Sequence, residues 1–501
     1  MLLAGISMLS WLEAVLTALL ALGLLLTLSR HLWTLRWTLS RDRGSALPLP
    51  KGSMGWPFFG ETLHWLVQGS SFHSSRREKY GHVFKTHLLG KPVIRVTGAE
   101  NIRKILLGEH SLVSTQWPQS TQIILGSNTL LNSIGELHRQ RRKVVFSRAA
   151  LESYLPGIQK VVSWELRGWC REPGSVAVYS SAKTLTFRVA ARVLLGLSLE
   201  EKQFKDLAKT FEQLVENLFS LPLNIPFSGL RKGIKARDML HEYMEKAIME
   251  KLQRKNSEGH SDALDFLINS AKEHGKEFTM QELKESAIEL IFAAFFTTAS
   301  ASTSLILLLL KHPSAVEKIR QELVSHELHR QCHCLSPMNL DKLSRLRYLD
   351  CVIKEVLRVL PPVSGGYRTA LQTFELDGYQ IPKGWSVMYS IRDTHETAAV
   401  YQSPPESFDP DRFGSARQED GKGAGRFHYI PFGGGVRSCI GQELAKAILK
   451  LLAIELVSTA RWELATPSFP EMQTVPIVHP VDGLQLFFHP LQPENQISTG
   501  K

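Results

Sequence analysis

Two long apolar runs stand out in a chain whose other apolar residues mostly recur at helical spacing. Residues 11–28 carry a single charge, at Glu13, and residues 290–310 carry none. Both runs approach the roughly 20 residues needed to cross a bilayer. The second run also holds the polar cluster 297–304, which does not suit contact with lipid. We therefore expect the first run to be a membrane anchor and the second to be a long helix buried through the middle of a large domain.

The charges around the first run favour an uncleaved anchor over a cleaved signal peptide. A signal peptide would place basic residues before the apolar run and a small-residue cleavage site after it. Here the basic residues follow the run: Arg30, Arg36, Arg41 and Arg43. Positive charge on that side keeps it in the cytoplasm. We expect residues 1–30 to form a single-pass anchor, with Trp33 and Trp37 at the membrane interface, and residues 31–57 to form a basic, proline-rich linker.

The remainder of the chain predicts a mainly α protein with a small β region (α+β). Helical spacing of apolar residues extends over 101–107, 184–197 and 204–219. Residues 83–86 and 92–97 alternate as short strands do, with Gly90-Lys91 as the turn between them. We expect residues 58–495 to form one large domain built around the long central helix.

Composition narrows the functional classes. The 501 residues are 43% hydrophobic, enough for a large core, and carry a net charge of +11, which suits an anionic membrane surface or an acidic partner. No long basic tract interleaved with aromatic residues is present, so nucleic acid is not an expected partner. The five cysteines are odd in number and scattered, which suggests no disulfide framework and fits a reducing, cytosol-facing environment.

The most informative stretch is residues 432–441, Phe-Gly-Gly-Gly-Val-Arg-Ser-Cys-Ile-Gly. Glycines let a backbone pass close to a flat, bulky group. Cys439 then precedes a helical pattern, whose N-terminal N–H groups favour a thiolate. Such a thiolate suits an axial ligand of haem iron, with Phe432 near the sulfur and Arg437 paired with a propionate. A buried structural cysteine is the alternative, but the pattern Phe-x-x-Gly-x-Arg-x-Cys-x-Gly is far more constrained than that reading requires.

This segment resembles the haem-binding loop of the cytochrome P-450 superfamily, the haem-thiolate monooxygenases. The resemblance implies haem as the cofactor, Cys439 as the iron ligand, and Phe432, Arg437 and Gly441 as cofactor-binding residues. In the central helix it implies that Thr297 is catalytic. The superfamily places an acid before this threonine, whereas the present chain has Phe296, which puts the usual proton relay in doubt.

The same resemblance extends to other charged positions. His138 and Arg142, four apart on one helix face, stand where the superfamily holds the haem propionates; the alternative is a solvated charged face. Arg368 stands at a further propionate position. Glu355 and Arg358, together with Arg412, resemble the buried ionic cluster of the superfamily, which is structural and braces the haem loop. Alone, the first pair would be a surface salt bridge of little value.

Several unbroken stretches resemble the retinoic acid hydroxylase branch, and Phe295-Phe296 resembles its third member most. The stretches are residues 85–88, 105–110, 219–229, 361–370, 374–385 and 430–435. Seven aromatic or apolar residues are candidates for lining the substrate pocket, although each could instead pack in the core: Trp117, Phe219, Phe292, Phe295, Phe296, Val363 and Tyr367.

That resemblance implies hydroxylation of all-trans retinoic acid, or its 9-cis isomer, at an allylic ring carbon (4-hydroxylation), for retinoic acid catabolism. The resemblance implies that O2 supplies the inserted oxygen atom and that the electrons come from NADPH through the flavins of a flavoprotein reductase. It also implies that the protein lies in the endoplasmic reticulum membrane. Two alternatives stay open. One is a haem-thiolate isomerase or dehydratase, which the loss of the acid before Thr297 favours. The other is a non-catalytic retinoid-binding haem protein.

Overall fold

The computed structural model describes most of the chain. Its described residues are 2–69, 71–115, 117–126, 129, 147–197, 199–253, 262–273, 278–328, 337–397, 399–420, 423–474 and 477–491. The chain divides into two compact units. Unit 1 comprises Met1–Gln116 and Gly365–Thr394, and unit 2 comprises Trp117–Ser364 and His395–Lys501.

Unit 1 is built on a five-stranded sheet with the strand order β1-β2-β8-β5-β3. All neighbouring strands are antiparallel except β2 and β8, which are parallel. The strands are β1 (Val83–Leu88), β2 (Lys91–Val96), β3 (Val113–Thr115), β5 (Gly365–Ala370) and β8 (Ser386–Ser390), and a separate hairpin pairs β6 (Phe374–Leu376) with β7 (Tyr379–Ile381). The helices are α1 (Leu2–Leu39), α2 (Thr62–Gln68), α3 (Ser71–Tyr80) and α4 (Ala99–Leu107), and α16 (Ile391–Glu396) begins in this unit.

Both hairpins of unit 1 close through two-residue turns with positive φ angles. Leu89 (φ 52°) and Gly90 (φ 78°) join β1 to β2, and Asp377 (φ 54°) and Gly378 (φ 78°) join β6 to β7. Such turns match the right-handed twist of the flanking strands, and Asp-Gly is among their preferred sequences. The predicted strand pair is confirmed, with its turn one residue earlier than expected.

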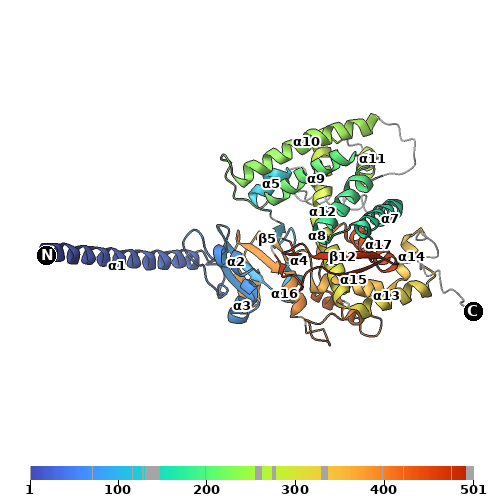
Figure 1. Ribbon diagram of the computed structural model, residues 1–501. Coiled ribbons are helices and arrows are strands. Elements are labelled where there is room, and N and C mark those ends of the chain that lie inside the picture. The colour runs from blue at the N-terminus through green and yellow to red at the C-terminus, as the bar shows by residue number, and fades with distance from the viewer. Residues whose placement is uncertain are drawn as a thin grey trace, which may run out of the picture. The chain divides into compact units, whose positions relative to one another are not determined.

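The helix α1 is continuous from Leu2 to Leu39 (Figure 1), and none of its apolar window within Trp11–Leu39 is buried. Its last turns pack on unit 1 itself. The Trp33 indole is buried, its Nε1 donates to the Met54 carbonyl at 3.1 Å, and its ring lies against those of Trp37 and His87. Trp33 therefore packs on the protein itself, and its placement at the membrane interface stays a prediction.

Unit 2 is predominantly helical (Figure 1). Its α-helices are α5 (Gln119–Leu125), α7 (Arg148–Arg171), α8 (Val178–Val189), α9 (Glu201–Glu216), α10 (Gly229–Gln253), α11 (Ala263–Glu273), α12 (Met280–Lys311), α13 (Pro313–Ser325), α14 (Leu340–Arg345), α15 (Arg347–Val359) and α17 (Gln442–Thr459). A π-helical segment, η1 (Ala190–Leu194), follows α8, and short 3-10 helices are η2 (Pro410–Phe413), η3 (Gly423–His428) and η4 (Gly435–Arg437). A three-stranded sheet orders β4 (Val176–Ala177), β12 (Gln485–Pro490) and β9 (Ala460–Leu464), and β10 (Met472–Gln473) pairs with β11 (His479–Pro480).

The central helix of unit 2 is α12. It starts with a capping box in which Thr279 and Glu282 satisfy each other's backbone N–H groups. It ends at Lys311, and His312 separates it from Pro313, which opens α13. Of the apolar window that could span a membrane, 72% is buried, so α12 is a core helix as predicted.

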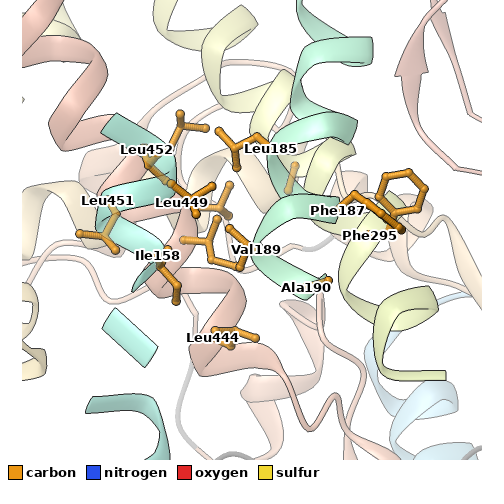
Figure 2. Close-up of a cluster of buried hydrophobic side chains, with 14 of the residues drawn as sticks. Ile158, Leu185, Phe187, Val189, Ala190, Phe295, Leu444, Leu449, Leu451 and Leu452 are labelled. Carbon is orange, nitrogen blue, oxygen red and sulfur yellow. The ribbon is translucent and has the colours of Figure 1, made fainter. Parts of the chain in front are cut away.

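The core of unit 2 forms where α12 contacts α8, α10 and α17. Figure 2 shows part of this cluster, with side chains from α7, α8, η1, α12 and α17 converging. Because α12 and α17 both contribute to one packed cluster, the segments that carry Thr297 and follow Cys439 are parts of a single core. The predicted fold class, mainly α with a small β region, is confirmed.

Candidate active site

The loop before α17 holds the predicted iron ligand. Gly433 (φ 68°) and Gly435 (φ 66°) adopt the left-handed conformation that glycine accepts without strain. The loop folds back on itself, because the Cys439 N–H donates to the Phe432 carbonyl at 2.9 Å and the Gly433 N–H donates to the Ile430 carbonyl at 2.9 Å. This geometry leaves Cys439 exposed, three residues before α17 begins.

Three further residues of the loop were predicted to bind the cofactor. The Phe432 ring is half-buried against the core, and the ammonium of Lys446 lies 5.9 Å from its centroid. Arg437 is half-buried within η4, and Gly441 caps the N-terminus of α17. An accessible sulfur at the end of a glycine-rich loop is a donor set that fits haem iron. The individual propionate contacts stay predictions.

One turn of α12 is accessible to solvent, whereas the turns on either side of it are buried. Ala293 is the one exposed residue between positions 282 and 310, a stretch that is described throughout. Thr297, one turn later, is half-buried, and its hydroxyl donates to the Ala293 carbonyl at 2.8 Å. This bond does not interrupt the helix, and α12 remains α-helical there. The small accessible patch at Ala293 and Thr297 is what a catalytic turn on a buried helix requires.

Phe295 and Phe296 point into different environments. Phe295 is 1% exposed and packs against Phe187 and Phe211, with ring centroids at 5.4 and 6.2 Å. Its carbonyl accepts a hydrogen bond from the Thr186 hydroxyl at 3.1 Å. Phe296 is half-buried and touches the Phe295 ring at 4.4 Å. Phe295 therefore packs in the core (Figure 2), and its role in a substrate pocket stays a prediction.

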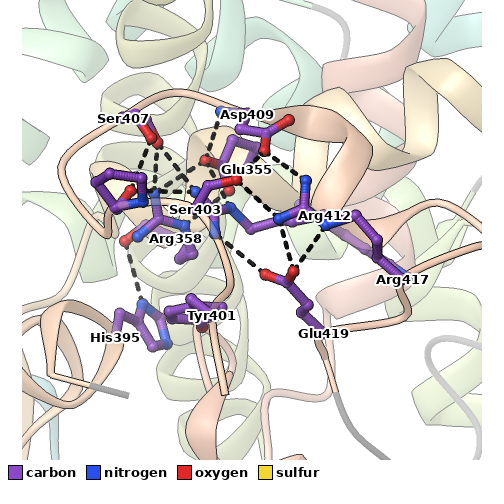
Figure 3. A network of polar contacts seen from close by, with 12 residues as sticks. Glu355, Arg358, His395, Tyr401, Ser403, Ser407, Asp409, Arg412, Arg417 and Glu419 are labelled. Carbon is purple, nitrogen blue, oxygen red and sulfur yellow. Dashed lines mark hydrogen bonds and ion pairs between the residues drawn. The ribbon is translucent and has the colours of Figure 1, made fainter. Parts of the chain in front are cut away.

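The predicted ionic cluster is present and fully buried (Figure 3). The Arg358 Nε and Nη2 donate to the two Glu355 oxygens at 2.7 and 2.9 Å, and the Arg412 Nε donates to Glu355 at 3.1 Å. The Asp409 N–H donates to the same carboxylate at 2.8 Å, and Arg412 also pairs with Glu419 at 3.2 Å. Every side chain of the central triad is at most 1% exposed. The predicted burial and pairing of the cluster are confirmed, and its structural role stays a prediction.

The remaining predicted residues are dispersed. His138 and Arg142 lie outside the described residues. Arg368 and Tyr367 belong to unit 1, where the Arg368 Nε donates to Glu109 at 2.7 Å. In unit 2, Trp117 and Phe292 are half-buried, whereas Phe219 is 47% and Val363 38% exposed. The pocket roles of these four residues stay predictions.

One buried charge in unit 1, Arg95, was not predicted from the sequence. Arg95 is 5% exposed, and its Nε has no hydrogen-bond partner among the described residues. Burial lowers the pKa of this guanidinium from its usual value. A desolvated guanidinium nitrogen without a partner is a group that an anion satisfies. Arg95 belongs to no motif, and its burial depends on the sheet around it.

Comparisons with known proteins agree with this geometry. The chain matches the family model described as Cytochrome P450 over residues 50–487. It is 69% identical to the Homo sapiens protein named Cytochrome P450 26C1, covering 98% of both chains, and 60% identical to Cytochrome P450 26B1 of Rattus norvegicus, covering 97% of this chain and 96% of that one. The solved structure titled retinoic acid bound cyanobacterial CYP120A1 matches with a TM-score of 0.80 and 36% identity, over 89% of this chain and 100% of that chain.

A helical core, a cysteine at the end of a glycine loop and a buried Glu/Arg/Arg cluster together fit the class of haem-thiolate proteins. The chain belongs to the cytochrome P-450 family. The family implies haem with a cysteine thiolate as the axial ligand, and the exposed Cys439 sulfur fits that group.

Proposed function

We propose that the protein is a haem-thiolate monooxygenase that hydroxylates retinoic acid at an allylic ring carbon. In the balanced reaction, one C–H bond becomes C–OH, the second oxygen atom of O2 leaves as water, and two electrons and two protons are consumed. The electrons come from NADPH through a membrane-bound flavoprotein reductase. The observation that carries this proposal is the exposed Cys439 at the end of its glycine loop. The relatives named above support the choice of a retinoid as substrate.

The chain's own residues have defined tasks in this proposal. When bound, haem supplies the activation of O2, with the Cys439 sulfur as its electron-donating ligand. Thr297 directs its hydroxyl proton to the Ala293 carbonyl, so the lone pairs of Oγ1 are left to accept a hydrogen bond from a proton donor at the open turn. The Phe296 side chain has no acidic proton to donate, so proton delivery depends on the Thr297 hydroxyl and on solvent that reaches Ala293.

Restoring an acid beside Thr297 tests this account of proton delivery. We expect Phe296→Asp to raise severalfold the fraction of NADPH electrons recovered in hydroxylated product, because a positioned general acid accelerates proton transfer by roughly 10²–10⁴-fold. The measurement is NADPH consumed against product formed. Phe296→Ala is the matched control, since it removes the same ring contact with Phe295 without adding an acid. Equal coupling in both variants would mean that protons arrive by a route independent of position 296.

The substrate assignment is tested by turnover of the purified full chain with reductase. A panel of retinoic acid isomers, retinol and fatty acids is offered, and the products are identified. The proposal predicts hydroxylated retinoic acid at a rate well above that of any fatty acid. Tight binding of retinoic acid without turnover would instead support the non-catalytic retinoid-binding protein.

A non-oxidative isomerase or dehydratase is the second candidate, and one observation favours it. Phe296 replaces the acid that superfamily members use with the following threonine, and such a reaction needs no proton delivery to oxygen. Product formation without O2 or reductase would support this candidate.

We also propose that α1 anchors the protein in the endoplasmic reticulum membrane, with the catalytic domain facing the cytoplasm.

Removing residues 2–30 should move the protein from the membrane pellet to the soluble fraction while leaving its stability unchanged. Trp33→Ala should instead leave it in the membrane and lower the free energy of unfolding by about 3–5 kcal/mol, the range for a buried tryptophan. Fractionation measures membrane attachment, and denaturant titration measures stability. A soluble Trp33→Ala protein would contradict the assignment of anchoring to residues 2–30 and of packing to Trp33.

A further inference from the structure

His395 lies near the end of α16 and joins two backbone groups from distant segments. It is 0% exposed. Its Nδ1 lies 3.2 Å from the Arg358 carbonyl (Figure 3). The Ile430 N–H donates to its Nε2 at 2.9 Å. The ring also stacks on Tyr429, with centroids 5.5 Å apart and planes inclined by 22°. The imidazole is therefore fixed at both nitrogens and on one face.

The partners determine the protonation of this ring. Because the Ile430 N–H is a donor, Nε2 must carry a lone pair. Nδ1 must then carry the hydrogen, which it donates to the Arg358 carbonyl. The neutral form that this requires agrees with burial, which lowers the pKa of His395 to about 3.

The two ends of this bridge belong to features already described. Arg358 is held by Glu355 in the buried cluster. The Ile430 carbonyl accepts from the Gly433 N–H, and the next turn of the loop closes through the bond from Cys439 to Phe432. A continuous path of hydrogen bonds and short backbone segments thus runs from the cluster through His395 to the loop that presents the sulfur.

We propose that His395 is a positioning residue for the Cys439 ligand, because its neutral imidazole ties the Arg358 carbonyl to Ile430, two residues before the 432–441 loop. This proposal rests on the haem-thiolate function proposed above. His395 does not touch the sulfur. Its effect is to fix Ile430, whose carbonyl accepts from the Gly433 N–H in the segment that leads to Cys439.

The test compares three full-length proteins: wild type, His395→Phe and His87→Phe. His395→Phe keeps an aromatic ring against Tyr429 and loses both hydrogen bonds. His87 is the matched control, since it is 1% exposed and neither ring nitrogen has a hydrogen-bond partner among the described residues. The first readout is hydrogen exchange at the Ile430 amide, followed by mass spectrometry. The second is the fraction of carbon monoxide-bound protein that keeps the thiolate-ligated absorbance.

We expect His395→Phe to speed exchange at Ile430 by about tenfold or more, the effect of losing one buried hydrogen bond. We also expect it to lower the thiolate-ligated fraction severalfold, with both readouts near wild type in His87→Phe. His395→Gln, which can donate and accept, should recover part of each loss. Unchanged exchange and absorbance in His395→Phe, or equal losses in His87→Phe, would overturn the proposal.

Two further outcomes keep the tests separate. If His395→Phe does not fold, the exchange rate of the Ile430 amide in the wild-type protein is the test. Exchange as fast as that of an exposed loop amide would show that His395 does not hold Ile430 and would overturn the proposal. A wild type without thiolate-ligated absorbance contradicts the haem-thiolate function itself and, with it, the positioning role.

Discussion

Replacing Cys439 with alanine abolishes the haem-thiolate absorbance and reduces retinoid turnover below detection. This is the expected result because the sulfur is the single side-chain ligand that the loop presents at its exposed end. Alanine keeps the small size of the side chain and the backbone bond from residue 439 to Phe432, so the loop has no cause to refold. The carbon monoxide difference spectrum measures the first loss, and product analysis with reductase measures the second.

Cys351→Ala is the control for this substitution. Cys351 is 8% exposed, and burial raises the pKa of its thiol to about 11, so it remains a protonated core side chain. Its removal should leave the absorbance intact. Retention of the thiolate-ligated absorbance in Cys439→Ala would overturn the ligand assignment.

Replacing Glu355 with glutamine should lower the free energy of unfolding by about 3–5 kcal/mol and reduce haem incorporation. Glu355 is the common acceptor for Arg358, Arg412 and the Asp409 N–H, and it is 0% exposed. Removing one partner of a buried ionic cluster leaves the remaining charges without compensation, which costs about this much. Denaturant titration gives the stability, and the ratio of haem to protein gives the incorporation.

A surface ion pair near the same segment provides the comparison. Lys318 and Asp411 pair at 3.0 Å, but their side chains are 52% and 59% exposed. Asp411→Asn should therefore change the free energy of unfolding by less than about 1 kcal/mol. Equal effects of the two substitutions would contradict the bracing role of Glu355.

Features that depend on local pattern were predictable from the sequence. The cysteine loop is one contiguous motif, and two of its glycines, Gly433 and Gly435, adopt the positive φ angles that only glycine accepts freely. The central helix was predictable because an uncharged run that contains threonines and serines suits burial in protein and not in lipid. The Glu355 cluster was predictable only through resemblance, since the spacing of Glu355 and Arg358 alone fits an exposed helix pair equally well.

Features that depend on tertiary contacts were not predictable. His395 stands in no motif, and its two partners are backbone groups 37 and 35 residues away. The burial of Trp33 follows from its packing on His87 and from its bond to Met54, which the charge pattern around the anchor does not reveal. Phe295 and Phe296 are adjacent and chemically identical, yet the turn of the helix buries the first and leaves the second half-exposed.

The most direct test of the proposed monooxygenase is the origin of the oxygen atom in its product. Purified full-length protein, reductase, NADPH and retinoic acid are incubated under isotopically labelled O2, and the product is analysed by mass spectrometry. The account predicts hydroxylated retinoic acid that carries one labelled oxygen atom per molecule and forms only when NADPH is present. A rearranged or dehydrated retinoid without label, formed equally well in the absence of O2, would contradict it.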